Sequence, residues 1–135
     1  MKYIIGISGY FHDSSVCLVA GNTLIEFIKE ETLTRVKGTN EFPYRSLGLL
    51  RDRYNLTSHN IQFVCFYEKP LRGWSSTISF SFKRPIHRME LLKNQLKQFW
   101  SGPTHVISDI LKTLDIKEDQ IIFAPHHVSH VLSAT

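Results

Sequence analysis

Three histidines lie close together near the end of the chain, in the stretch Pro125-His126-His127-Val128-Ser129-His130. They follow a short apolar run, residues 121–124, that is typical of a buried strand. Proline suits the first turn of a helix, so the pattern predicts a strand that leads directly into a helix. Residues four apart share one face of a helix, so His126 and His130 could bind a metal ion or a phosphate together. His127 lies about 100° further round and could reach a ligand from the side.

Two simpler interpretations compete with a binding site at these histidines. Histidines at the start of a helix can be solvated, and two imidazoles do not complete a metal coordination sphere. The site is favoured because helix amino ends attract anions and because ligand sites in open α/β sheets collect at the carboxyl ends of strands.

A second candidate site is the loop Ser8-Gly9-Tyr10-Phe11-His12-Asp13-Ser14-Ser15, which follows the first apolar run. Its small residues leave room for a ligand, and its backbone N–H groups could face an anion. His12 and Asp13 are able to exchange protons. A plain hairpin with a surface histidine would have the same composition, so this alternative stays open.

The order of predicted elements gives the fold class. We expect strands over residues 3–8, 14–20, 23–29, 61–67 and 121–124, and helices from Pro43, from Pro85, over 106–114 and from Pro125. We expect the first strand to be central and covered on both faces. We expect residues 30–37 to form a solvated loop or a lip over a site. We expect the core to include Tyr44, Leu47, Leu50 and Tyr54. The segment 73–82 alternates like a strand over 78–82 but is rich in serine.

Tight turns make the opening strands antiparallel, and helical connections make the later strands parallel. The sequence therefore predicts an α/β, ribonuclease-H-like (actin/sugar-kinase-like) half-domain with a mixed five-stranded sheet and flanking helices.

Composition sets limits on the class of protein. The chain has 135 residues, 42% of them hydrophobic, which suits one soluble domain with a real core. The net charge is +4, and the excess is concentrated between Lys69 and Lys97, where seven Lys and Arg residues face one acid, Glu90. This basic stretch could bind phosphate groups, contact nucleic acid, or form the solvated side of a helix, which is the default reading.

The cysteines and the length of the apolar runs indicate where in the cell the protein is expected. Cys17 and Cys65 lie inside apolar runs, which favours buried thiols over a disulfide and agrees with a reducing cytoplasm. No apolar run approaches the roughly 20 residues of a membrane span, and the first strand begins without a preceding signal peptide. We therefore expect a cytoplasmic protein with no membrane partner.

Five ordered motifs carry a resemblance to a known family. They are Gly6-Ile7-Ser8-Gly9-Tyr10-Phe11-His12-Asp13-Ser14-Ser15; Glu30-Glu31 with Thr34, Arg35 and Lys37; Phe42-Pro43; Phe66-Tyr67-Glu68-Lys69-Pro70; and His126-His127 with Ser129, His130, Ser133 and Ala134. Together they resemble the amino-terminal part of the O-carbamoyltransferases, which act on nodulation factors, cephamycins and aminoglycosides. The resemblance spans nearly the whole chain.

The resemblance implies an activity and its partners. Family members move a carbamoyl group from carbamoyl phosphate to a hydroxyl on a small molecule, and they use ATP through a carbamoyl-adenylate. Their two-lobed actin-like domain holds a divalent metal, Fe²⁺ or Zn²⁺, through the paired histidines and acidic ligands from later in the chain. By the same resemblance, His126 and His130 are metal ligands, and His127 lies near phosphate or substrate. His12 and Asp13 stand where the family places an acid/base group, and Lys69 and Arg35 are anion contacts.

The resemblance covers only the amino-terminal lobe, over residues 1–135. We expect the second lobe, its acidic ligands and the nucleotide-processing domain to be absent, and the chain alone to be inactive. Uncovered apolar surface could lead to a homodimer. The alternatives are a non-catalytic half-domain that binds nucleotide or metal, and a nucleic-acid binder that uses the basic stretch, which lacks a known pattern of base-reading aromatics.

Overall fold

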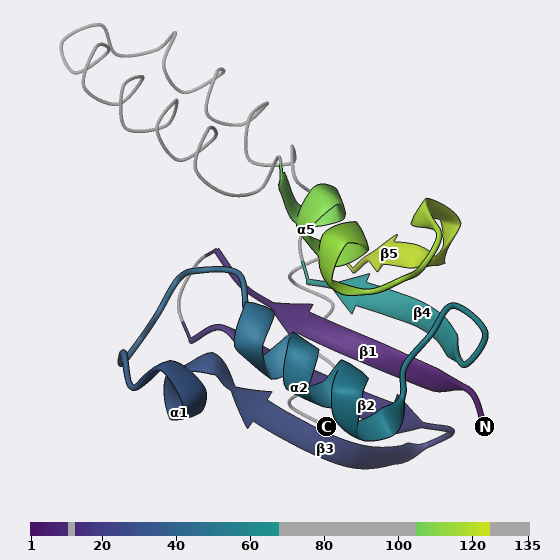
Figure 1. Ribbon diagram of the computed structural model, residues 1–135, viewed down its shortest axis with the longest axis horizontal. Helices are drawn as coiled ribbons and strands as arrows, with labels where there is room; N and C mark the ends of the chain where they lie inside the picture. The colour runs from purple at the N-terminus through teal and green to yellow at the C-terminus, as the bar shows by residue number, and fades with distance from the viewer. Residues whose placement is uncertain (11–12, 68–104, 125–135) are drawn as a thin grey trace, which may run out of the picture.

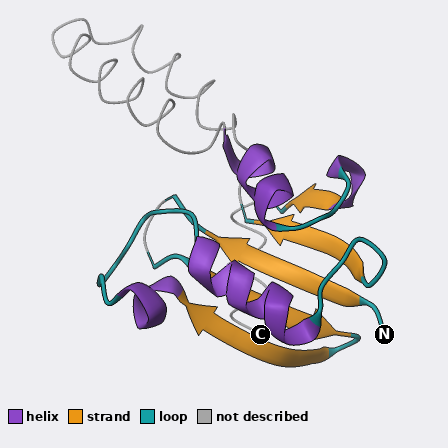
Figure 2. Ribbon diagram, viewed as in Figure 1, coloured by secondary structure: helices purple, strands orange, loops and turns teal. Residues whose placement is uncertain are grey.

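A computed structural model describes residues 1–10, 13–67 and 105–124 of the chain (Figures 1 and 2). The opening segment forms three strands and two helices, and the remaining described part adds two strands, one helix and a 3-10 turn. These elements are β1 (Tyr3–Ser8), β2 (Ser15–Ala20), β3 (Thr23–Lys29), α1 (Glu30–Thr34), α2 (Tyr44–Tyr54), β4 (Ile61–Phe66), α5 (Val106–Thr113), η3 (Glu118–Gln120) and β5 (Ile121–Phe123).

The five described strands form one mixed sheet in the order β3-β2-β1-β4-β5. β1 pairs with β2 and β2 with β3 in antiparallel fashion, whereas β1–β4 and β4–β5 are parallel. The turn between β2 and β3 uses Gly21 at φ 59°, a left-handed conformation that glycine adopts without steric cost. The α/β half-domain of ribonuclease-H-like type that the sequence predicts is thus confirmed, including its antiparallel opening and parallel later strands.

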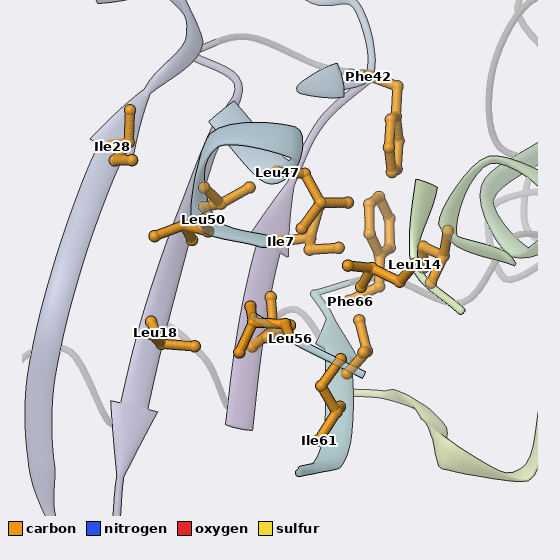
Figure 3. Close-up of a cluster of buried hydrophobic side chains, with 14 of the residues drawn as sticks. Ile7, Leu18, Ile28, Phe42, Leu47, Leu50, Leu56, Ile61, Phe66 and Leu114 are labelled. Carbon is orange, nitrogen blue, oxygen red and sulfur yellow. The ribbon is translucent and has the colours of Figure 1, made fainter. Parts of the chain in front are cut away.

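The hydrophobic core lies between the sheet and the helices α2 and α5. Alternate residues of the strands point to this side, and Leu47 and Leu50 of α2 are completely buried against them (Figure 3). Ile110 on α5 is also fully buried, so both helices cover the same face of the sheet. The buried apolar side chains are Ile5, Ile7, Val16, Leu18, Ile28, Phe42, Leu47, Leu50, Leu56, Ile61, Val64, Phe66, Val106, Ile110 and Leu114.

Three expectations about local structure need correction. Residues 30–34 form the short helix α1 rather than a loop. Glu30 is only 3% exposed, and its carboxylate accepts a hydrogen bond from the N–H of Ser46 in α2. Tyr44 is not core: it is 48% exposed, and its hydroxyl reaches a polar partner. β1 is central, but only Ile5 and Ile7 on its helix side are buried, while Ile4 on the other side is half-buried.

Several predicted elements lie outside the described residues. They are the segment 73–82, the helix from Pro85, the basic stretch between Lys69 and Lys97, and the histidine helix after Pro125. Within the described ranges, both cysteines are free thiols, as expected, but they are half-buried rather than buried. No described helix combines the length and the apolar character that crossing a bilayer requires.

Candidate functional site

The sheet topology brings three candidate segments to one edge. Because β1, β4 and β5 are parallel, their carboxyl ends lie side by side, with Ile7 opposite Phe66 and Phe66 opposite Phe123. The loop with His12 and Asp13 follows β1, Glu68-Lys69 follows β4, and the histidine stretch follows β5. Ligand sites in open α/β sheets form at such edges, so the strand order supports one shared site.

The structure locates two of the seven predicted site residues. Asp13 is an exposed residue of the β1–β2 loop, in a left-handed conformation with φ 52°. Arg35 is exposed at the end of α1, also left-handed at φ 63°, and it follows β3. One strand, β2, lies between β3 and β1. Arg35 is therefore at the same edge of the sheet, on the side farthest from β5. The other five lie outside the described residues, and their roles stay predictions: His12, Lys69, His126, His127 and His130.

The start of the β1–β2 loop is held by a buried carboxylate that sequence reasoning did not single out. Asp109 on α5 is 6% exposed and accepts hydrogen bonds from the hydroxyls of Tyr10 and Tyr44, the latter at 2.6 Å. Tyr10 itself is left-handed at φ 68°, a conformation that costs free energy in a non-glycine residue. Its ring also packs against Phe42 and Phe66. These contacts fix the loop immediately before His12.

The same carboxylate changes the acidity of the two phenols. Partial burial, followed by the hydrogen bond to Asp109, raises the pKa of Tyr44 to about 12. Burial and the same carboxylate also raise the pKa of Tyr10 well above its ordinary value. Both phenols therefore stay protonated near neutral pH and act as hydrogen-bond donors rather than as bases.

The other end of the loop is tied to the segment before α2. Ser14 is buried, and its hydroxyl lies 3.1 Å from the carbonyl oxygen of Thr39 and 2.5 Å from that of Glu41. Its N–H also donates to the Thr39 carbonyl at 3.2 Å, and its own carbonyl accepts the N–H of Glu30 at 2.8 Å. The loop that carries His12 and Asp13 is therefore anchored at both ends.

Glu30 supplies the cap that α2 lacks in its own sequence. Pro43 precedes the helix and provides no side-chain cap. The Glu30 carboxylate instead accepts the N–H of Arg45 at 3.1 Å and of Ser46 at 2.8 Å. An anion is favourable at the positive end of a helix, so this contact orients α2 against β3 and α1.

A pocket of about 260 Å³ opens on the sheet face opposite α2, near the same edge. Gly6, Cys17 and Cys65 lie across its floor on neighbouring strands, and Tyr67 and Ala124 contribute to its lining. A Cβ atom at Gly6 would lie 2.6 Å from the Cys17 sulfur, so only glycine leaves this space. Burial raises the pKa of both thiols.

Sequence comparison with known proteins agrees with this architecture. The fold defines the class of protein, which is an α/β half-domain with a candidate site at the carboxyl edge of its sheet. Residues 3–135 match the family described as Carbamoyltransferase N-terminus, and the chain belongs to that family. It is 26% identical over 152 aligned residues to "Uncharacterized protein sll1178" of Synechocystis sp., covering 99% of this chain. The chain spans only 23% of that relative's length.

Proposed function

We propose that this chain is the amino-terminal lobe of an O-carbamoyltransferase. In this proposal water releases phosphate from carbamoyl phosphate, the resulting carbamate attacks the α-phosphate of ATP to form a carbamoyl-adenylate with loss of pyrophosphate, and the carbamoyl group passes to a hydroxyl of a small molecule with loss of AMP. The family membership supports the general class. The observation that carries the proposal for this lobe is the meeting of the β1, β4 and β5 carboxyl ends at one edge.

His12 is the residue proposed to activate the acceptor. A hydroxyl is a weak nucleophile at neutral pH, so an imidazole within reach is a suitable general base. The hydroxyl oxygen attacks the carbamoyl carbon, its proton passes to His12, and the adenylate leaves. Asp13 could orient the base, while His127, Lys69 and Arg35 would contact anionic groups of the substrates. The anchoring of Tyr10 and Ser14 supports this role because it holds the loop on both sides of His12.

The histidine pair is proposed to hold Fe²⁺ or Zn²⁺, since imidazole nitrogen suits both metals. When bound, such an ion would polarise a phosphate or carbamoyl oxygen. His126 and His130 lie outside the described residues and fit the metal in ligand type. Among the residues that the structure describes, no three or more His, Cys, Asp or Glu side chains cluster as a metal site of their own.

Metal titration of the histidine variants tests this assignment. We expect the purified chain to bind Zn²⁺ in a calorimetric titration, and His126→Ala and His130→Ala each to weaken the affinity tenfold or more. His59→Ala is the matched control, because His59 is exposed and precedes the amino end of β4, at the opposite edge of the sheet. Equal affinities for all four proteins would contradict the assignment.

The chain by itself is expected to be inactive. Two imidazoles leave the metal site open, and the chain spans less than a quarter of its relative. With ATP, carbamoyl phosphate and a panel of hydroxyl acceptors, mass spectrometry should detect no carbamoylated product. Product formation by the purified chain would refute this expectation.

A non-catalytic half-domain that binds nucleotide or metal is the second candidate. The two candidates differ in one measurement. A binding module would retain ATP or metal affinity but would not support carbamoyl transfer when combined with the remaining parts of a carbamoyltransferase.

A further inference from the structure

Two thiols and a glycine form one row across the middle of the sheet. In the strand register, Gly6 of β1 lies opposite Cys17 of β2 on one side and opposite Cys65 of β4 on the other. Directly paired residues of neighbouring strands point to the same face of a sheet, so both thiols stand on the face opposite α2. Cys17 and Cys65 are the only cysteines of the chain, and both are half-buried.

The Cys17 sulfur leans over the glycine that separates it from Cys65. A Cβ atom on Gly6 would lie 2.6 Å from that sulfur, so the sulfur fills the space that a side chain at Gly6 would take. Cys65 also responds to the charge of its neighbour. Burial is the largest cause that raises the pKa of Cys65, and the charge of a Cys17 thiolate is the second. No side chain of β1 therefore stands between the two sulfurs.

The spacing of this row is too wide for a disulfide but suits an ion that bridges the two sulfurs. Two strand spacings place the Cα atoms of Cys17 and Cys65 roughly 9.6 Å apart, whereas a disulfide needs Cα atoms within about 7 Å. Because Cys17 already leans inward, an inward rotamer of Cys65 narrows the gap between the sulfurs. Two metal–sulfur bonds of about 2.3 Å each can span the gap that remains.

The ligands and their surroundings favour a soft ion of low charge. Thiolates select Cu⁺, which accepts two of them in a line, whereas Zn²⁺ takes four ligands. The pocket of about 260 Å³ at this row has room for an ion, and Val16, Phe27 and Phe66 contribute to its walls. Apolar walls disfavour two free thiolates, and an ion between the sulfurs offsets part of their charge.

We propose that Cys17 and Cys65 bind one Cu⁺ ion between them, above Gly6, as a linear pair of thiolates. Binding forms two copper–sulfur bonds and releases one proton from each thiol to solvent. No electron is transferred, and the bound unit keeps a single negative charge because two thiolates face one monovalent ion. The site goes beyond the proposed function, since neither carbamoyl transfer nor the histidine pair enters the argument.

Anaerobic competition between the purified chain and the Cu⁺ chelator bicinchoninate, with ascorbate present, tests the site. We expect the native chain to take up one Cu⁺ per molecule. Cys17→Ser and Cys65→Ser should each lower the affinity by about a hundredfold or more, because the second thiolate binds at a high effective concentration. X-ray absorption of the copper-loaded chain should show two sulfur neighbours and no nitrogen neighbour. Retained affinity in either serine variant, or a nitrogen neighbour, would overturn the proposal.

Val19→Ser is the matched control, because it places the same new side chain on the same face of β2, two residues from Cys17. We expect it to change the Cu⁺ affinity by less than about twofold, as a surface change away from the ligands should. Circular dichroism shows whether the variants stay folded. If a serine variant unfolds, Cys17→Ala and Cys65→Ala give the same test without a new hydroxyl.

Two further outcomes would assign the ion to another site. A chain with both His126→Ala and His130→Ala should bind Cu⁺ as the native chain does, and loss of binding there would overturn the proposal in favour of the histidines. A copper-dependent dimer on gel filtration would overturn it by placing thiols of two copies on one ion. The Zn²⁺ titration of the histidine variants stays a separate test, so the two proposals can fail independently.

Discussion

Replacing Asp109 with alanine is expected to lower the free energy of unfolding by about 3 kcal/mol, because two hydrogen bonds to one buried carboxylate are lost together. Asp109 is 6% exposed, and the hydroxyls of Tyr10 and Tyr44 both donate to it. The alanine variant leaves these phenols without their acceptor and releases the loop before His12. Urea unfolding followed by circular dichroism measures the change.

Two controls separate this contact from a general effect of removing an aspartate. Asp115→Ala removes an exposed carboxylate just after the same helix, and we expect it to change stability by less than about 0.5 kcal/mol. The phenols give a second readout. The pKa of Tyr44, about 12 in the native chain, should fall toward its ordinary value of about 10 in Asp109→Ala, and absorbance at pH 11 would detect the tyrosinate. A stability loss no larger than that of Asp115→Ala would contradict the role assigned to Asp109.

The sign of the pH dependence follows from the direction of the shift. The pKa of Tyr44 is higher in the folded chain than the ordinary value of about 10. Its contribution to stability is therefore complete below pH 10 and is lost as the pH rises toward 12. The stability difference between the native chain and Asp109→Ala should narrow over this range.

Glu30→Ala is expected to cost about 2 kcal/mol, near the upper limit for a helix cap. The Glu30 carboxylate is buried and is the acceptor for two N–H groups at the start of α2, those of Arg45 and Ser46. No side chain at Pro43 could replace it. Denaturant unfolding measures the loss, and Glu30→Gln should recover about half of it because one carbonyl acceptor remains.

Glu31→Ala provides the matched comparison on the same helix. Its carboxylate accepts the N–H of Gly38 at 3.1 Å and lies 3.9 Å from the Lys29 amine, but it is partly exposed. Contacts of this type near solvent contribute less than about 1 kcal/mol. If Glu30→Ala and Glu31→Ala lowered stability equally, Glu30 would be an ordinary surface acid rather than the cap of α2.

Most of the architecture could be predicted from the sequence because its signals are local. Apolar runs marked all five strands, the Gly21-Asn22 turn set the antiparallel pairing, and Pro43 marked the start of α2. Glu30 was misread because a charged residue after a strand normally meets solvent. Its partners, Arg45 and Ser46, lie 15 and 16 residues away, so nothing adjacent in the sequence indicates the cap.

The candidate site could be predicted only as far as topology reaches. Parallel pairing of β1, β4 and β5 follows from the order of elements, and it places the three motif-bearing segments at one edge. The contacts that hold the β1–β2 loop were not predictable in this way. Tyr10 and Asp109 are 99 residues apart, and an aspartate in the first turn of α5 is also typical of an ordinary solvated helix start.

The position of β3 has a consequence for handling the protein in solution. β3 is a border strand of the described sheet, seven residues long, and Leu24, Ile25 and Phe27 on it are 60%, 39% and 53% exposed. A border of this kind offers unpaired backbone groups and apolar side chains to a passing chain, which is how sheets add foreign strands and aggregate. Lys29, exposed at the end of β3, is the kind of charge that discourages such growth. Colloidal stability at high concentration is therefore expected to depend in part on the charge of Lys29.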